Sequence, residues 1–239
     1  MKITVIYDNR GYEPDWETGW GFSALIENND NEKLLFDTGD NADKLVKNLS
    51  KSSIDIKKIN ALTFSHADWD HKDGAEGFLK VNGSAYVYIP HSFPEEFRNM
   101  VEKKNHRYTL IGYSKNKLIK NVFSTPVFTV EDKPEEQGII VQGSKGLALI
   151  TGCAHPGILY MVMRAKEIFE QEVRMILGGF HLKELSIEDT NKLIDDLKKE
   201  GVEYFAPCHC TGEKQIGVFK KECGDGFIKI GAGKVVKFN

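Results

Sequence analysis

Four side chains that can bind metal ions lie within six positions of one another, in the segment 65–71 (SHADWDH). They are His66, Asp68, Asp70 and His71. Imidazole and carboxylate groups together form the usual ligand set for zinc, iron or manganese. The segment directly follows an apolar run over residues 59–64 (INALTF) that is typical of a strand. A regular strand or helix cannot direct all four groups at one ion, but a strand that breaks into a tight loop can. The alternatives are therefore a metal site at a strand end and a merely solvated polar loop.

Three further histidines each follow an apolar run in the second half of the chain. His155 comes after 147–150, His181 after 173–177, and His209 after 202–206. In layered α/β proteins such strand ends converge on one edge, where sites are built. One such histidine alone is more often a structural residue that is satisfied by a hydrogen bond. Three of them, together with the segment 65–71, favour a shared metal site.

The rest of the pattern alternates strands with helices, as expected for an α/β fold. Besides the runs 173–177 and 202–206, we expect strands over 2–8, 22–28, 33–37, 59–64, 85–89, 107–112, 117–123, 126–130, 138–142 and 146–151. We expect helices over 43–49 and 94–103, from Gly157 to Phe169, and after Ser186. No linker or low-complexity segment interrupts the chain, so we expect one domain over residues 1–239.

Composition excludes several classes of protein. A chain of 239 residues that is 41% hydrophobic and 28% charged is long enough to bury a substantial core. The net charge of −3 and the absence of a long basic run argue against nucleic acid as the main partner. The amino terminus resembles a strand more than a signal peptide, and no apolar run approaches the length of a membrane span. The four cysteines form no disulfide framework, which fits a cytoplasmic location.

The order of the motifs resembles the metallo-β-lactamase superfamily over almost the whole chain. The features that carry this resemblance are Asp37-Thr38-Gly39 after a strand, the segment 66–71, and the later His155 and His209. One branch is especially similar, the metal-dependent hydrolases related to dihydropterin or methanopterin synthesis, through 21–27 (GFSALIE), 152–157 (GCAHPG), 178–182 (GGFHL) and 209–212 (HCTG). The resemblance implies a four-layer αββα sandwich with a metal site at one edge.

The resemblance also implies which residues hold the metal. The superfamily motif His-x-His-x-Asp-His places His66, Asp70 and His71 at ligand positions, and the later histidines are His155 and His209. Asp37 resembles the structural aspartate that supports such a site from behind. We expect a first metal position made by His66, Asp68 and His155, and a second made by Asp70, His71 and His209.

Two positions depart from the superfamily pattern. Asp68 stands where the second histidine usually does, which makes the first position more anionic and favours a harder ion. Iron and manganese thus join zinc as candidates, and the flavodiiron branch is similar in carrying a carboxylate there. His181 stands where the superfamily often has a bridging aspartate. An imidazole can ligate one ion or contact substrate but does not bridge two ions as a carboxylate does. A full two-metal site is therefore not assured, and one or two divalent ions per chain are expected.

The leading functional interpretation is a metal-dependent hydrolase of a small ester or phosphodiester. A divalent cation lowers the pKa of bound water from ~16 to about 7, and the resulting hydroxide attacks a carbonyl or phosphoryl centre. Asp70 is expected to orient the water, and His181 is a candidate proton donor or substrate contact, with a backbone hydrogen bond as the competing role. Two alternatives remain open: a non-haem iron redox enzyme, suggested by Asp68, and a small-molecule-binding protein with little turnover.

The expected substrate is a small molecule of heterocyclic or phosphorylated type, with neither nucleic acid nor a membrane as partner. Tyr12, Trp16 and Trp20 lie in one glycine-containing loop and form either a lid over the site or ordinary surface packing. Trp69 either walls the site or packs in the core. Cys208 and Cys210 flank His209, and we expect both to be small buried fillers whose side chains point away from it.

Overall fold

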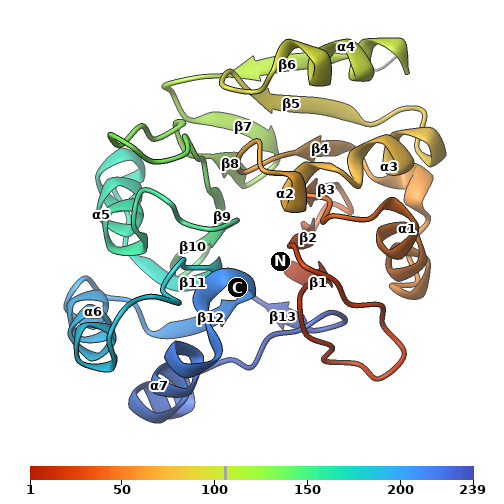
Figure 1. Cartoon of the computed structure of the whole chain (residues 1–239). Helices are drawn as coiled ribbons and strands as arrows, with labels where there is room; N and C mark the ends of the chain where they lie inside the picture. Colours follow the sequence, from red (N-terminus) through yellow and green to blue (C-terminus); the bar gives the residue numbers. More distant parts are fainter. Residues whose placement is uncertain (105–106) are drawn as a thin grey trace.

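The computed structural model describes residues 1–104 and 107–239, in which two β-sheets lie face to face and helices cover their outer sides (Figure 1). The first sheet has the strand order β13-β1-β2-β3-β4-β5-β6. Its strands are β1 (Lys2–Tyr7), β2 (Ser23–Glu27), β3 (Lys33–Phe36), β4 (Ala61–Thr63), β5 (Tyr86–Pro90), β6 (Tyr108–Ile111) and β13 (Val235–Lys237). The second sheet has the order β12-β11-β10-β9-β8-β7. Its strands are β7 (Asn116–Ile119), β8 (Val122–Ser124), β9 (Ile139–Gly143), β10 (Gly146–Thr151), β11 (Val173–Gly179) and β12 (Tyr204–Cys208).

The helices divide between the two sheets in sequence order. The first sheet is covered by α1 (Ala42–Lys51), α2 (Trp69–Lys72), α3 (Ala75–Val81) and α4 (Glu95–Lys103), and the second by α5 (Ile158–Phe169), α6 (Ile187–Lys199) and α7 (Glu213–Cys223) (Figure 1). Short 3₁₀ turns are η1 (Ile56–Lys58), η2 (His209–Thr211) and η3 (Gly224–Gly226). The start of α6 is set by Ser186, whose hydroxyl accepts a hydrogen bond from the Asp189 backbone nitrogen at 3.0 Å.

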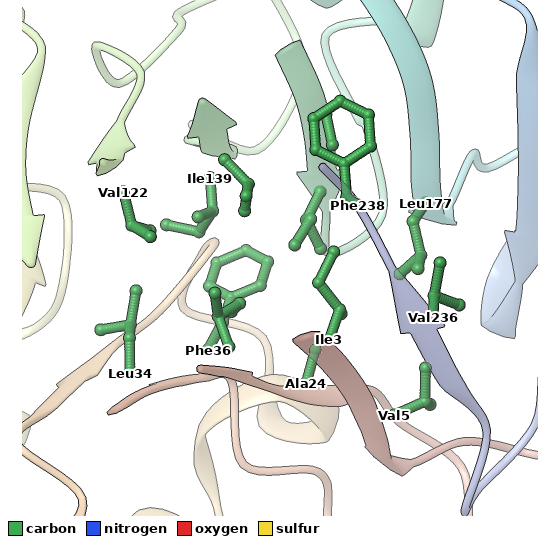
Figure 2. Packing of buried hydrophobic residues seen from close by; sticks show 14 of the residues in the cluster. Ile3, Val5, Ala24, Leu34, Phe36, Val122, Ile139, Leu177, Val236 and Phe238 are labelled. Carbon is green, nitrogen blue, oxygen red and sulfur yellow. The ribbon is translucent and has the colours of Figure 1, made fainter. Parts of the chain in front are cut away.

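Alternation of side chains along each strand builds three apolar layers. In β2, Ala24 and Ile26 face the opposite sheet, whereas Leu25 faces the helices of its own sheet. Figure 2 shows the layer between the sheets, where Leu34 and Phe36 of β3 point toward side chains of the second sheet. A third cluster lies between the second sheet and helices α5 to α7. The α/β four-layer αββα sandwich that the sequence predicts is therefore confirmed.

Most expected elements form within one or two residues of their predicted ends, with two exceptions. The expected strand 117–123 is wrong as a single element, because Asn121 adopts a left-handed φ of 60° and turns the chain between β7 and β8. The expected strand 126–130 is also wrong: Phe128 forms only an isolated bridge with Glu136. That bridge brings Glu136 back to the edge of the two sheets. Among the helices of residues 1–104 and 107–239, none has the length and apolar character needed to cross a bilayer.

Candidate metal centre

The candidate site lies where the chain leaves five strands: β3 and β4 in the first sheet, and β10, β11 and β12 in the second. Four non-glycine residues adopt a left-handed backbone directly after these strands: Asp37 (φ 57°), Ala154 (φ 56°), His181 (φ 51°) and His209 (φ 49°). Such a conformation is uncommon for residues other than glycine and clusters at functional sites. Here it turns the chain after β3, β10, β11 and β12, and three of the four residues, Asp37, His181 and His209, present their own side chains at this edge.

The segment that follows β4 breaks into the tight loop that the sequence predicts. The Ser65 backbone nitrogen donates to Asp37 Oδ1 at 2.7 Å, which ties the start of the loop to the end of β3. The short helix α2 then begins after Asp68, so that Asp70 and His71 lie in its single turn. This geometry lets neighbouring residues of one segment serve two separate groups of ligands.

Two groups of three side chains come together at this edge. The possible ligand atoms within each group all lie within 4.8 Å of one another, and the groups are His66, Asp68, His155 and Asp70, His71, His209. His66 Nε2 lies 3.3 Å from Asp68 Oδ2, and His209 Nε2 lies 3.3 Å from Asp70 Oδ2. These are the two groupings that we expected from the sequence. Each takes two residues from the loop after β4 and one from a strand end of the second sheet.

All four imidazoles in these groups are held by their Nδ1 atoms. The partners and distances are His66 with Ser65 Oγ (2.8 Å), His71 with Asp37 Oδ2 (2.8 Å), His155 with Glu136 Oε2 (2.9 Å) and His209 with Asn9 Oδ1 (3.0 Å). A histidine that binds a metal through one nitrogen is usually oriented by a hydrogen bond at the other. The Nε2 atoms are thus the ones left to face the site.

Buried atoms without hydrogen bonds indicate what the site would hold. His66 Nε2 and His209 Nε2 are buried and make no hydrogen bond, although a carboxylate oxygen lies 3.3 Å from each. A buried polar atom without a partner is costly and needs an explanation. A divalent cation between imidazole nitrogens and carboxylates would satisfy these atoms, so the residues fit such an ion.

Glu136 supports the site from behind, and the sequence analysis did not identify it. Its fully buried carboxylate accepts hydrogen bonds from the backbone nitrogens of four consecutive residues, Gly152, Cys153, Ala154 and His155, at 2.9 to 3.2 Å. Burial alone would raise the pKa of Glu136, but the imidazoles of His66 and His155 and these donors hold it below its usual range. Glu136 therefore stays anionic and fixes the whole turn that carries His155.

Burial and neighbouring charges also shift the pKa values of Asp37 and His66. Burial raises the pKa of Asp37 to about 8, against the opposing effects of His66 and the Ser65 hydrogen bonds. Burial works to lower the pKa of His66, but Glu136, Asp68 and Asp37 outweigh it and raise the pKa to about 9. Without a metal ion, the site thus tends to keep a proton on His66.

The prediction that Cys208 and Cys210 are both buried fillers is right for Cys208 and wrong for Cys210. Cys208 lies in the apolar layer between the sheets. The chain leaves β12 in the 3₁₀ turn η2, where the alternation of a strand no longer applies, so the Cys210 sulfur comes within 4.8 Å of His209 and Cys153 ligand atoms. The overlooked signal in the sequence is Thr211-Gly212, a turn pair at the end of η2.

His181 lies at the rim of the site and is exposed. Its ring centroid lies 4.8 Å from that of His155, and its ligand atom lies within 4.8 Å of those of His155 and Cys153. A hydrogen bond to Cys210 raises the pKa of His181 despite partial burial. The histidine thus reaches the site from the side that is open to solvent.

A cavity of about 530 Å³ opens beside His209. Trp20 lines it, is 48% exposed, and places its ring centroid 5.5 Å from that of His209. The other lining residues are mainly charged or polar: Asn9, Arg10, Lys183, Glu184, Cys210, Gly212, Glu213, Lys214 and Gln215.

The remaining aromatic residues do not form one lid. Trp16 packs against the apolar cluster under α1, and Lys234 lies over the ring of Tyr12. Trp69 is 53% exposed, so it is not a core residue. Trp20 alone of the expected trio lies at the candidate site.

Comparison with known proteins agrees with this architecture. The family model of the metallo-beta-lactamase superfamily matches residues 19–162. The chain is 28% identical, over its full length and 97% of the other protein, to the 7,8-dihydropterin-6-methyl-4-(beta-D-ribofuranosyl)-aminobenzene-5'-phosphate synthase of Methanocaldococcus jannaschii. It superposes with a TM-score of 0.83 and 26% identity on Tm1679, a metal-dependent hydrolase of the beta-lactamase superfamily, covering 100% of this chain and 99% of that one. YhfI from Bacillus subtilis, at 14% identity and 98% coverage of both chains, shares the fold with a TM-score of 0.70.

Proposed function

The chain belongs to the metallo-β-lactamase superfamily, and we propose that it is a metal-dependent hydrolase of small phosphoesters or esters. The observation that carries this proposal is the pair of ligand groups whose buried Nε2 atoms, on His66 and His209, lack hydrogen bonds. Zinc is the favoured ion, with iron or manganese as alternatives because Asp68 supplies an oxygen ligand. His66, Asp68 and His155 would hold one ion, and Asp70, His71 and His209 a second.

Bound divalent cations supply Lewis acidity and make water a nucleophile near neutral pH. The chain's own residues provide the positioning. Asp70 Oδ2 lies 3.3 Å from His209 Nε2 and 3.8 Å from His71 Nε2, so its carboxylate can accept a hydrogen bond from a water held between these groups. His181 lies at the rim beside His155, with its ligand atom within 4.8 Å of that of His155, and carries a raised pKa, which suits it to donate a proton to the leaving group.

The cavity beside His209 supports an anionic, partly aromatic substrate. Lys183 and Lys214 line it, and α7 begins there without a side-chain cap. An uncapped helix terminus carries partial positive charge and favours a phosphate group. Glu213 pairs with Arg10 and Glu184 offsets one of the two lysines, so the lining keeps a small excess of positive charge. Trp20 offers an aromatic face for a ring, and the relative from Methanocaldococcus jannaschii has both a pterin and a phosphate in its name.

The test combines metal analysis with turnover. We expect the purified protein to contain or take up zinc or manganese, measured by inductively coupled plasma spectrometry, and to hydrolyse bis(p-nitrophenyl) phosphate or p-nitrophenyl acetate. His71→Ala should abolish turnover, while His91→Ala, which changes an imidazole bonded to Tyr113 outside the site, should leave it unchanged. Bound iron with a visible absorption band and oxygen consumption would overturn the proposal in favour of a redox enzyme. Metal-loaded protein that is inert toward both substrate types would also overturn it.

A further inference from the structure

The thiol of Cys153 lies among the imidazoles of both ligand groups. Its sulfur is 3.3 Å from His71 Nε2. It also lies within 4.8 Å of ligand atoms in three pairs of residues, which are His66 with His71, His155 with His181, and His209 with Cys210. One sulfur atom therefore reaches members of both groups, His66 and His155 on one side and His71 and His209 on the other.

The backbone fixes this sulfur in place. Glu136 Oε1 accepts hydrogen bonds from the nitrogens of Cys153 and Ala154 at 2.9 Å each, and Ala154 turns the chain with its left-handed φ of 56°. Gly152 permits the close approach, because a Cβ there would lie 2.1 Å from Ser65 Oγ. Cys153 is 5% exposed, so the sulfur faces the interior of the site and not solvent.

The distance to His71 suits two ligands of one ion. A sulfur about 2.3 Å and a nitrogen about 2.0 Å from a tetrahedral zinc lie roughly 3.5 Å apart. The simpler interpretation is that the Cys153 thiol only donates a hydrogen bond to His71 Nε2. The buried His66 Nε2 argues against this, since it belongs to the same ligand group as Cys153 and His71 and has no hydrogen bond of its own.

We propose that Cys153 is a thiolate ligand of the metal centre and is shared between its two ion positions. This inference rests on the proposed metal-dependent function and adds a ligand to it. The family resemblance places His181 where a bridging carboxylate often stands, and an imidazole does not bridge two cations as a carboxylate does, whereas a thiolate carries lone pairs for two cations. Binding of the divalent cation releases the thiol proton to solvent, so one proton leaves for each Cys153 that is ligated. A borderline or soft ion, zinc above manganese, is then preferred.

The test uses the full-length protein loaded with Co²⁺, whose thiolate complexes absorb strongly in the near ultraviolet. We expect this charge-transfer band in the wild type and in Cys208→Ser, the matched control in the apolar layer between the sheets. Cys153→Ser should lose the band and weaken zinc affinity by roughly tenfold or more in chelator competition. Cys210→Ser should keep the band. Loss of the band in Cys210→Ser with retention in Cys153→Ser would overturn the assignment.

A second variant covers the case in which Cys153→Ser does not fold. In the triple variant Cys208→Ser, Cys210→Ser, Cys223→Ser, Cys153 is the remaining cysteine, and the band should persist. X-ray absorption of the zinc form should show sulfur at about 2.3 Å. A protein that binds zinc and turns over phosphoesters with only nitrogen and oxygen ligands would overturn this inference alone. Cobalt-thiolate absorption without any hydrolysis would overturn the proposed function and leave the ligand assignment standing.

Discussion

Glu136 Oε2 lies 2.9 Å from the backbone nitrogen of His155 and 2.9 Å from its Nδ1 atom. One carboxylate oxygen thus sets both the position of the residue and the orientation of its ring. Because the other oxygen binds the preceding turn, Glu136 connects the loop before β9 to the end of β10.

The substitution Glu136→Gln should destabilise the protein. The amide would place a donor against the two His155 donors and lose a charge-assisted hydrogen bond, which costs about 1.5–3 kcal/mol. Urea unfolding in the presence of EDTA measures this difference. Glu131→Gln, an exposed change in the same loop, is the control and should leave the midpoint unchanged. Equal midpoints for the two variants would contradict the structural role of Glu136.

Asp37→Asn should weaken metal binding without unfolding the protein. Asparagine tolerates the left-handed backbone at this position, but its single amide oxygen cannot replace both Asp37 oxygens, of which Oδ1 accepts from the Ser65 nitrogen and Oδ2 holds His71 Nδ1. Loss of such a supporting partner typically lowers metal affinity by roughly 10- to 100-fold. Chelator competition gives the affinity, and circular dichroism verifies the fold. An affinity equal to that of the exposed control Asp15→Asn would refute the role of Asp37.

The stability of the metal-free protein should fall as the pH rises from 6.5 to 9. The folded-state pKa of His66, about 9, exceeds its ordinary value of 6.5, so the folded state holds a proton that the unfolded state releases. The proton on His66 thus contributes on the order of 3 kcal/mol at most to the free energy of unfolding. The contribution is fully present below pH 6.5 and is lost as the pH rises through about 9. Asp37 acts in the same direction, since burial raises its pKa from 3.8 to about 8.

Urea unfolding in EDTA at pH 6 and pH 9.5 checks this prediction. Zinc should reverse the trend, because the ion competes with the proton on His66, so the increase in Tm on adding zinc should grow with pH. Metal-free protein that is more stable at pH 9.5 than at pH 6 would show that His66 does not hold the proton.

His181→Asn should lower kcat by roughly 10²- to 10⁴-fold and change KM little, as expected for loss of a general acid. Asparagine again suits the left-handed backbone, where φ is 51°. Because the pKa of His181 is raised, the acid form persists above its usual range, and the alkaline limb of the kcat profile should disappear in the variant. A variant that keeps both kcat and this limb would exclude His181 as the proton donor.

Changes in the cavity beside His209 should separate binding from chemistry. Trp20→Ala should raise KM for an aromatic phosphoester about five- to tenfold, the effect of removing one stacking contact, with kcat nearly unchanged. Lys183→Gln together with Lys214→Gln should raise KM for phosphoesters and not for a neutral ester. Tyr113→Ala and Lys57→Gln, both exposed and outside the cavity, are the matched controls. Equal effects on charged and neutral substrates would exclude a phosphate subsite.

The segment 65–71 and the strand-end histidines could be identified as candidate ligands from the sequence, because the strand and the ligands that follow it are neighbours in the chain. A strand followed at once by metal-competent side chains predicts where those side chains gather, and His66 and His155 indeed lie in one group. The alternation of strands and helices predicted an α/β fold, and the four-layer arrangement followed from the resemblance alone. Asp37 could be named only through the resemblance, since nothing in its own neighbourhood points to His71.

The remaining parts of the site depend on contacts that are distant in sequence. Glu136 lies in a polar loop and gains its importance only when that loop folds against residues 152–155. Cys210 changes its direction because one 3₁₀ turn replaces the last step of a strand. The left-handed conformation of Asn121 likewise makes residues 116–124 a hairpin of β7 and β8 and not the single strand that was expected. Backbone conformations of this kind are set by the surrounding tertiary structure more than by residue type.

Each ligand group draws on both sheets, and this has a consequence for assembly. Residues before 72 and residues after 150 each carry an incomplete set of donors. Tight binding of a cation therefore requires that the two sheets have first packed together through the apolar layer between them. Zinc uptake by refolding chains should accordingly mark the moment at which the two halves dock, and separated halves of the chain should each bind zinc weakly.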